Sequence, residues 1–182
     1  MDTRFYYLQN PGSHSASEPL GEKEPKSLKL EFWKPSLFRM IPDGLSIYPF
    51  GVWWLFHLFR VFRNSEYGIV ILRGTEGTPV HRSCIFPRYF RFPFMTTTDV
   101  QVGDTYTDEA YRGQGIASYV LSYIRDHYAA TSRNIWYVVE EENAPSIKVA
   151  ERVGFTLIGR GTRQQSRFGS LFGHYLIEEN YN

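Results

Sequence analysis

The chain contains little cysteine and almost no net charge. Cys84 is the one cysteine among 182 residues, which excludes an internal disulfide and is typical of a reducing compartment. We therefore expect a cytoplasmic protein. The 20 Lys and Arg residues against 19 Asp and Glu leave a formal charge of +1, with acids and bases interspersed. This balance does not favour a polyanion-binding surface, so no nucleic-acid partner is expected.

The sequence also lacks an uninterrupted hydrophobic run of membrane-spanning length. Its most apolar segment is Leu45–Phe62, LSIYPFGVWWLFHLFRVF. Four residues interrupt this segment: Pro49, Gly51, His57 and Arg60. The stretches between them are too short to cross a bilayer. We expect a buried helix over about Val52–Phe62; the alternative is a helix that lies against a membrane surface or a lipid-like substrate.

The first 30 residues contain no apolar core of signal-peptide length. They are polar and contain proline, which predicts a loosely ordered lead-in or a strap over the domain. The remaining residues, 31–182, are enough for one full core and too few for two domains. We therefore expect one domain over residues 31–182.

From residue 66 onward, the chain alternates between β-rich and helical segments. The expected strands are Tyr67–Arg73, Val80–Phe86, Val100–Thr107, Ile135–Val139, Phe155–Gly159 and Leu171–Ile177. The expected helices are Gly115–Ala129 and Pro145–Val153. The turn residues 74–77 favour a hairpin between the first two strands. The pattern predicts a single α/β domain with a mixed sheet, whose central pair of strands is joined by a βαβ crossover.

Residues Arg112–Ala117, RGQGIA, stand directly before the apolar face of an expected helix. Gly113 and Gly115 allow the backbone to turn tightly and to bring its N–H groups close to a ligand. The first turn of the helix adds unsatisfied donors and the positive end of its dipole. These features predict an anion cradle, for which phosphate is the usual ligand.

Two other phosphate-binding motifs fit this loop less well. The chain contains no G-x-x-x-x-G-K-S/T string, which excludes a Walker A loop. Gly113, Gly115 and Ser118 approximate a dinucleotide fingerprint, with Glu140 at the end of the next strand. That fingerprint requires a buried strand that runs straight into the first glycine, and several parallel crossovers. Here the polar connector TDEAYR intervenes and a single crossover is expected, which disfavours a dinucleotide.

The loop resembles the acyl-CoA pyrophosphate motif R/Q-x-x-G-x-G/A of the GNAT acetyltransferase superfamily. Arg112, Gly115 and Ala117 stand at its fixed positions. A second stretch, Asn143–Phe155 (NAPSIKVAERVGF), is similar to the following helix of the family and its Gly-Phe end. The order of elements also agrees, and the resemblance covers about residues 66–178. It implies a mixed, mostly antiparallel sheet that is splayed at the acyl-CoA site and flanked by helices.

The resemblance implies acetyl-CoA as the acyl donor, without a metal. Backbone groups of the strand before the loop would face the pantetheine and the thioester: Thr105, Tyr106 and Thr107. Beside Arg112, loop N–H groups would bind the pyrophosphate: Gly113, Gln114, Gly115, Ile116 and Ala117. Asn143 and Ser146 would lie beside the pantetheine and the sulfur. Asn143 is also a candidate N-cap of the helix that contains Pro145.

The implied reaction moves an acetyl group from the thioester to a primary amine by direct attack in a ternary complex. The amine must lose a proton, and three residues are candidate bases: His81, Asp104 and Glu140. Their simpler interpretations are a packed or surface histidine, a turn or paired carboxylate, and a solvated carboxylate, respectively. Many family members protonate the thiolate with a tyrosine on the second helix, where this chain has Ala150. Either Ser146 or Tyr137 replaces it, or the thiolate leaves unassisted.

The variable first half of such proteins builds the acceptor pocket, which assigns residues 31–65 to the acceptor side. This half and the stretch Arg88–Met95 are rich in aromatic residues, which suit stacking on a sugar or base; Arg82, Arg88 and Arg91 could neutralise phosphates. The stretch is similar to GNAT members of bacterial surface-polysaccharide synthesis, so a nucleotide-linked amino sugar is the expected acceptor. The alternatives are a small-molecule amine, a protein N-terminus, or a non-catalytic acyl-CoA-binding module. The sequence leaves the oligomeric state open, and a homodimer is one of the alternatives.

Overall fold

A computed structural model describes residues 2–8, 27–129, 131, 133–166 and 169–181. Its centre is an eight-stranded sheet in the order β2-β3-β4-β5-β6-β1-β7-β8. The strands are β1 (Asp2–Leu8), β2 (Lys29–Trp33), β3 (Gly68–Arg73), β4 (Pro79–Pro87), β5 (Val100–Thr107), β6 (Ile135–Glu140), β7 (Thr156–Ser166) and β8 (Gly169–Asn180). The helices are α1 (Ile47–Leu58), α2 (Ile116–Ala129), α3 (Ala144–Arg152) and the short 3-10 helix η2 (Glu109–Tyr111).

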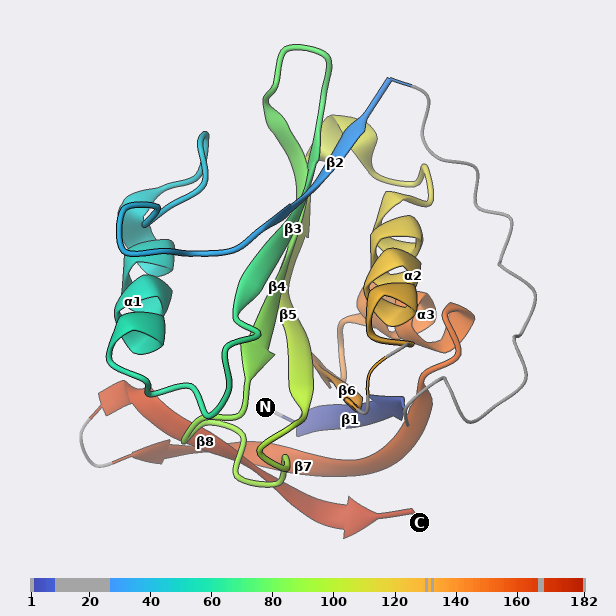
Figure 1. Ribbon diagram of the computed structural model, residues 1–182. Helices are drawn as coiled ribbons and strands as arrows, with labels where there is room; N and C mark the ends of the chain where they lie inside the picture. Colours follow the sequence, from blue (N-terminus) through green and yellow to red (C-terminus); the bar gives the residue numbers. More distant parts are fainter. Residues whose placement is uncertain (1, 9–26, 130, 132, 167–168, 182) are drawn as a thin grey trace.

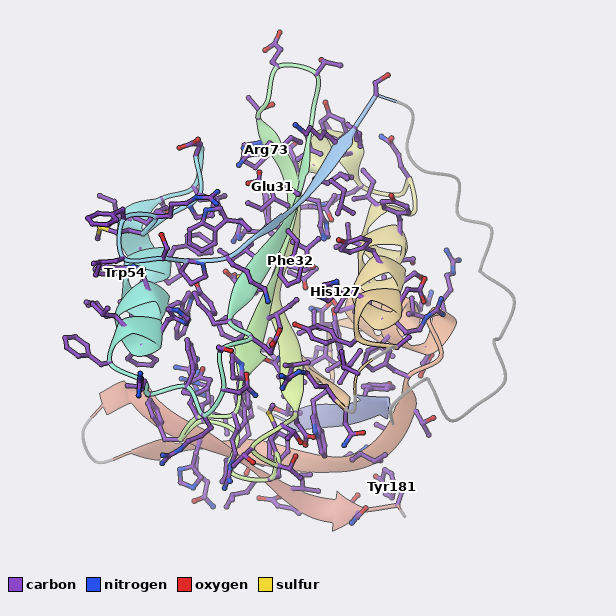
Figure 2. All side chains as sticks on the ribbon, viewed as in Figure 1. Glu31, Phe32, Trp54, Arg73, His127 and Tyr181 are labelled. Atoms are coloured by element: carbon purple, nitrogen blue, oxygen red, sulfur yellow. The ribbon has the colours of Figure 1, made fainter. Side chains whose placement is uncertain are left out.

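The helices form two layers around the sheet. Helix α1 covers one face, and α2 and α3 cover the other (Figure 1). Each face of the sheet has its own apolar core. The core under α2 and α3 contains residues such as Val120 and Ile124 of α2. The core under α1 is rich in aromatic residues, such as Trp53 of α1. Phe32 of β2 packs edge-on against His127 of α2, with ring centroids 4.8 Å apart (Figure 2). Two cores on opposite faces explain why the strands between them are buried on both sides.

The expected fold class is confirmed. Strands β5 and β6 run parallel and are joined by α2, whereas the other neighbouring strands described here are antiparallel. The hairpin expected across residues 74–77 joins β3 and β4. The last two strands are longer than expected, and they cross one end of the molecule as a hairpin (Figure 1).

The first strand corrects the interpretation of residues 1–30 as a loosely ordered segment. Strand β1 lies inside the sheet, between β6 and β7, and pairs antiparallel with both. Its Tyr6 is fully buried, and the Tyr6 hydroxyl donates a hydrogen bond to Glu151 Oε1 at 3.1 Å. The burial of Tyr6 and the pairing on both sides hold the strand in place. Lys29 and Leu30, from the same expected segment, belong to β2; residues 9–26 lie outside the described part.

Helix α1 differs from the expected buried helix over Val52–Phe62. It begins at Ile47 and ends at Leu58, and its buried residues are Phe50 and Trp53. Several large apolar side chains of the helix and its end are exposed: Ile47, Tyr48, Leu55, Leu58 and Phe59. Trp54 (Figure 2) donates from Nε1 to the carbonyl oxygen of Ser36 at 3.0 Å. Among the described residues, no helix is long and apolar enough to cross a membrane.

Strands β5 and β6 diverge, and this divergence positions the site. Their parallel ladder ends at the pair Val102 and Tyr137, although β5 continues to Thr107 and β6 to Glu140. Beyond the ladder, β6 pairs with β1 on its other side, and β5 pairs with β4. The register of β4 and β5 shifts close to Asp104, whose φ of +45° lies in the left-handed region. Such a bulge bends a strand, which helps to open the gap.

Candidate active site

A cavity of about 610 Å³ lies where β5 and β6 separate, beneath α2 and α3. Its walls come from the ends of both strands, the glycine-rich loop, the first turn of α2 and one side of α3. The lining residues are Thr105, Tyr106, Thr107, Tyr111, Arg112, Gly113, Gly115, Ile116, Ala117, Ser118, Tyr137, Pro145, Ser146, Lys148, Val149 and Arg152. A cavity of this size holds a cofactor-sized ligand. Nine of the expected donor-site residues are among them.

The glycine-rich loop forms one end of this cavity. Asp108 caps η2 by accepting a hydrogen bond from the N–H of Ala110 at 3.0 Å. Gly113 and Gly115 then take φ values of +76° and +78°, which L side chains rarely adopt. No atom lies within 4 Å of the place where a Cβ would stand on either glycine. The loop backbone is therefore open to a ligand at the N-terminus of α2, where the first N–H groups have no partner within the helix.

Cationic side chains surround the loop. Arg112 donates from Nε to the carbonyl oxygen of Thr107 at 3.1 Å, and its guanidinium lies 5.8 Å from the ring centre of Tyr106. These contacts fix Arg112 against β5. Lys148 and Arg152, one helical turn apart on α3, line the cavity from the other side. Arg112 also forms an ion pair with Glu109 at 3.3 Å, on the surface. Three cationic side chains in a cavity with open N–H groups make it suitable for a polyphosphate.

The inner end of the cavity holds hydroxyl groups, from Thr105 of β5, Tyr137 of β6 and Ser146 of α3. Burial raises the pKa of Tyr137, and hydrogen bonding by the Ser146 and Thr105 side chains partly offsets this effect. Asn143 caps α3: its Oδ1 accepts a hydrogen bond from the N–H of Ser146 at 3.2 Å. The inner end therefore offers a protonated phenol at neutral pH beside the gap between the strands.

Two expected donor-site residues do not line the cavity. Asn143 has the N-cap role that the sequence offered as its alternative. Gln114 is exposed, and its Nε2 donates to the carbonyl oxygen of Ala110 at 3.2 Å. That hydrogen bond closes the loop upon η2 and leaves the neighbouring backbone to face the cavity.

His81 is the first of the three candidate bases, and it is 1% exposed. Its Nδ1 lies 2.7 Å from Thr107 Oγ1, and its Nε2 lies 3.0 Å from Ser83 Oγ. Burial, with a smaller contribution from the Arg82 guanidinium, lowers the pKa of His81 to about 4. The imidazole is therefore neutral at pH 7, with both nitrogens engaged.

Asp104, the second candidate, lies on the opposite side of β5. Its carboxylate accepts a hydrogen bond from Arg82 Nη2 at 3.3 Å and contacts Cys84 Sγ at 3.7 Å. Burial, followed by the charge of Asp104, raises the pKa of the Cys84 thiol, so this buried cysteine is protonated at neutral pH. The strand bulge turns Asp104 away from the donor cavity and toward the α1 face.

A second cavity, of about 160 Å³, lies on that face and contains Asp104. It opens beside the same two strands, through Gly103 of β5 and Val138 of β6. Its other lining residues are mostly aromatic: Trp53, Phe86, Tyr89, Arg91, Phe92, Gln101 and Tyr175. Phe92 and Tyr175 stack at a centroid distance of 5.7 Å. The two cavities thus approach the divergent strands from opposite faces of the sheet.

Glu140, the third candidate base, is exposed at the end of β6 and lines neither cavity. Strand alternation places it on the same sheet face as Val138. The structure therefore brings Asp104 to the smaller cavity, connects His81 to the larger one through Thr107, and leaves Glu140 outside both.

Several residues that line the cavity were not predicted from the sequence as site residues. Lys148 and Arg152 carry the signal of two cations four residues apart, which indicates a shared helix face. Tyr111, Ser118 and Val149 carry no such signal, since their positions depend on how η2, α2 and α3 pack together. Among the described residues, no three His, Cys, Asp or Glu side chains are grouped to hold a metal ion.

The fold and the site define an α/β protein with a glycine-rich loop at the mouth of a gap between two diverging parallel strands. The sequence matches the profile of the acetyltransferase (GNAT) family over residues 31–155, and the chain belongs to that family. No curated protein sequence matches the chain.

Solved structures of GNAT proteins show the same fold. A GCN5-related N-acetyltransferase from Sphaerobacter thermophilus aligns with a TM-score of 0.55 at 16% identity, over 87% of this chain and 49% of the other. A GNAT-family protein from Novosphingobium aromaticivorans gives 0.52 at 14% identity, over 88% and 62%. An acetyltransferase from Colwellia psychrerythraea gives 0.51 at 17% identity, over 86% and 52%. The chain thus spans about half to three fifths of the length of these structures.

Proposed function

We propose that this protein transfers an acetyl group from acetyl-CoA to a primary amine by direct attack in a ternary complex. The observation that carries the proposal is the open backbone of Gly113 and Gly115, at the mouth of a cavity that reaches the divergent strands. Membership of the GNAT family supports acetyl-CoA as the ligand.

In this proposal, the CoA pyrophosphate binds the N–H groups of residues 113–117, with Arg112, Lys148 and Arg152 supplying positive charge. The pantetheine extends along Thr105–Thr107 into the gap between β5 and β6. The thioester then lies at the inner end of the cavity, beside Tyr137. A backbone N–H of β5 stabilises the oxyanion that forms on the carbonyl.

The amine attacks from the second cavity, where Asp104 is the proposed base. The amine nitrogen forms a bond to the thioester carbon and gives its proton to the carboxylate. The carbon–sulfur bond breaks, and the thiolate receives a proton from the Tyr137 hydroxyl. Asp104 is preferred to Glu140 because it alone of the two borders a cavity. Its ion pair with Arg82, at 3.3 Å, holds the carboxylate in place.

The acceptor that we propose is an amino sugar, linked to a nucleotide. Aromatic side chains around a 160 Å³ cavity suit the apolar face of one sugar ring, and Arg91 adds a positive charge. A small-molecule amine or a protein N-terminus is the second candidate, because the aromatic lining of this cavity suits other amines as well. A cytoplasmic location and a homodimer remain predictions, which cell fractionation and light scattering would check.

The test is release of free CoA thiol from acetyl-CoA in the presence of single amines: hexosamines, nucleotide-linked hexosamines, polyamines and peptides. Release that depends on one amine, with an N-acetylated product of matching mass, supports the function and identifies the acceptor. Calorimetric binding of acetyl-CoA with no amine-dependent release across the panel would leave a non-catalytic binding module instead.

Two substitutions then test the base. Asp104→Asn should lower kcat at least tenfold and alter the low-pH side of the rate profile. The matched control is Asp126→Asn, since Asp126 also forms an ion pair, with Arg125 at 2.8 Å, but lies on the outer side of α2. Equal rates for both variants would exclude Asp104 as the base, and Glu140→Gln would then be profiled in the same way.

A further inference from the structure

A chain of hydrogen-bonded side chains runs beneath the donor cavity from Thr107 through His81 and Ser83 to Thr105. Beyond Thr105, it reaches Tyr137 of β6 and Ser146 of α3, which line the same cavity. The first three links are short: 2.7 Å from Thr107 to His81, 3.0 Å from His81 to Ser83, and 3.1 Å from Ser83 to Thr105. Thr105 and Ser146 line the cavity together with Tyr137, and hydrogen bonding by their side chains lowers the pKa of the phenol against the larger effect of burial.

Two members of this chain, His81 and Ser83, do not meet the cavity. The other four line it: Thr105, Thr107, Tyr137 and Ser146. His81 and Ser83 are 1% and 2% exposed. They share a sheet face with the threonines because His81 stands opposite Thr107 in the β4–β5 ladder. The chain therefore passes through the protein interior from the loop end of the cavity to its inner end.

Every member of the chain can pass a proton on. A hydroxyl group accepts one hydrogen bond while it donates another. A neutral imidazole has one N–H and one free lone pair, and burial keeps His81 neutral, with Arg82 as the nearby charge. A network needed only to hold the strands together would not require an imidazole bonded through both nitrogens, nor ends that open on the ligand cavity.

We propose that this chain resupplies the proton that Tyr137 gives to the departing thiolate, a role that rests on the acetyl transfer proposed above. The Tyr137 O–H bond breaks and an S–H bond forms on CoA. The phenolate then takes the Thr105 proton, and Thr105 takes the Ser83 proton. Ser83 takes the Nε2 proton of His81, whose Nδ1 takes the Thr107 proton.

Water at the loop end of the cavity replaces the proton lost by Thr107 and is left as hydroxide. The proton that Asp104 took from the amine passes to solvent and neutralises this hydroxide, so the protons balance for each thiol formed. The imidazole has then changed from its Nε2–H to its Nδ1–H form. After CoA leaves, water reaches Tyr137, and the same transfers in reverse restore the first form. In this account His81 and Ser83 act through Tyr137 and touch neither substrate.

The test uses Ser83, because it links the imidazole to the rest of the chain. Ser83→Ala should lower kcat tenfold or more with an unchanged KM for acetyl-CoA, and Ser83→Thr, which retains a hydroxyl, should restore most of the rate. The matched control is Ser122→Ala, another buried serine, on α2 and away from this chain. Circular dichroism and thermal melting show whether each variant folds.

Rates in mixtures of H₂O and D₂O distinguish a relay from a structural network. The wild type should give a curved dependence on deuterium content, which indicates several protons in motion, and Ser83→Ala a linear one. If Ser83→Ala keeps an unaltered kcat and a curved dependence of rate on deuterium content, the relay is overturned and the proposal of acetyl transfer is unaffected. Absence of amine-dependent turnover in the wild type would overturn both.

A second measurement needs no turnover. Nitrogen-15 NMR of the histidine rings should show a neutral His81 with one exchange-protected N–H from pH 5 to pH 8, and loss of that protection in Ser83→Ala. A His81 ring that titrates near pH 6.5 in the folded protein would overturn the relay.

Discussion

The pH dependence of stability tests the buried state of His81. Its pKa falls from 6.5 to about 4 on folding, mainly because burial disfavours the imidazolium ion. The unfolded chain therefore binds a proton between these pH values that the folded chain does not. Stability rises with pH wherever the unfolded state binds more protons. His81 should thus cost no stability above pH 6.5, and should destabilise the fold progressively as pH falls toward 4.

The size of this effect follows from the same pKa values. At about 1.4 kcal/mol for each pKa unit, the difference amounts to about 3 kcal/mol once the pH is below 4. That is a large part of the stability of an ordinary domain, which is about 5–15 kcal/mol. Burial also lowers the pKa values of His57 and His127. Their effect on the pH dependence of stability is the same in the wild type and in a His81 variant, so it cancels when the two are compared.

The assay is urea unfolding of the wild type and His81→Gln at several pH values from 7 to 4. The variant is less stable at pH 7 because it loses two hydrogen bonds, but the gap should narrow by about 3 kcal/mol as pH falls. His127→Gln is the control: the His127 ring is far more exposed than that of His81, so its removal should change the pH dependence much less. A constant gap between wild type and His81→Gln would refute the argument.

The other predictions concern the donor site and the first strand. Gly115→Ala and Gly77→Ala should each cost about 1 kcal/mol of stability because both glycines have φ near +77° and open space, but Gly115→Ala alone should weaken acetyl-CoA binding in calorimetry. Lys148→Ala and Arg152→Ala should each weaken that binding several-fold and reduce its salt dependence, which titration at two ionic strengths checks. Tyr6→Ala should lower the free energy of unfolding by about 3–5 kcal/mol in urea, because this buried ring lies in the central sheet; a loss below about 1 kcal/mol would show that β1 contributes little.

The sequence predicted the part of the fold in which local signals agree with tertiary structure. The strands from Gly68 to Glu140 combine β-branched runs with turn residues, and α2 and α3 have helical periodicity and recognisable ends. The glycine-rich loop was also predicted, because the left-handed backbone at positions 113 and 115 favours glycine, which can be recognised in the sequence. These features depend on neighbours close along the chain.

The remaining features depend on neighbours far along the chain. Strand β1 is stabilised by β6 and β7, which are more than 120 residues away along the chain. The sequence DTRFYYL contains no pattern that indicates which strands it pairs with. Helix α1 is apolar on all sides, so its sequence could not show that only the Phe50 and Trp53 side is buried. The bulge that turns Asp104 to the α1 face, and the hydroxyl partners of His81, likewise arise from strand register.

A structure of the protein crystallised with acetyl-CoA would show whether the cavity between β5 and β6 is the donor site. Pyrophosphate oxygens should lie within hydrogen-bond distance of the N–H groups of residues 113–117, and the thioester should lie between Thr105 and Tyr137. The acetyl group should face the cavity that contains Asp104. Acetyl-CoA bound elsewhere, with the loop and the gap between β5 and β6 unchanged and empty, would show that the donor site is wrongly assigned.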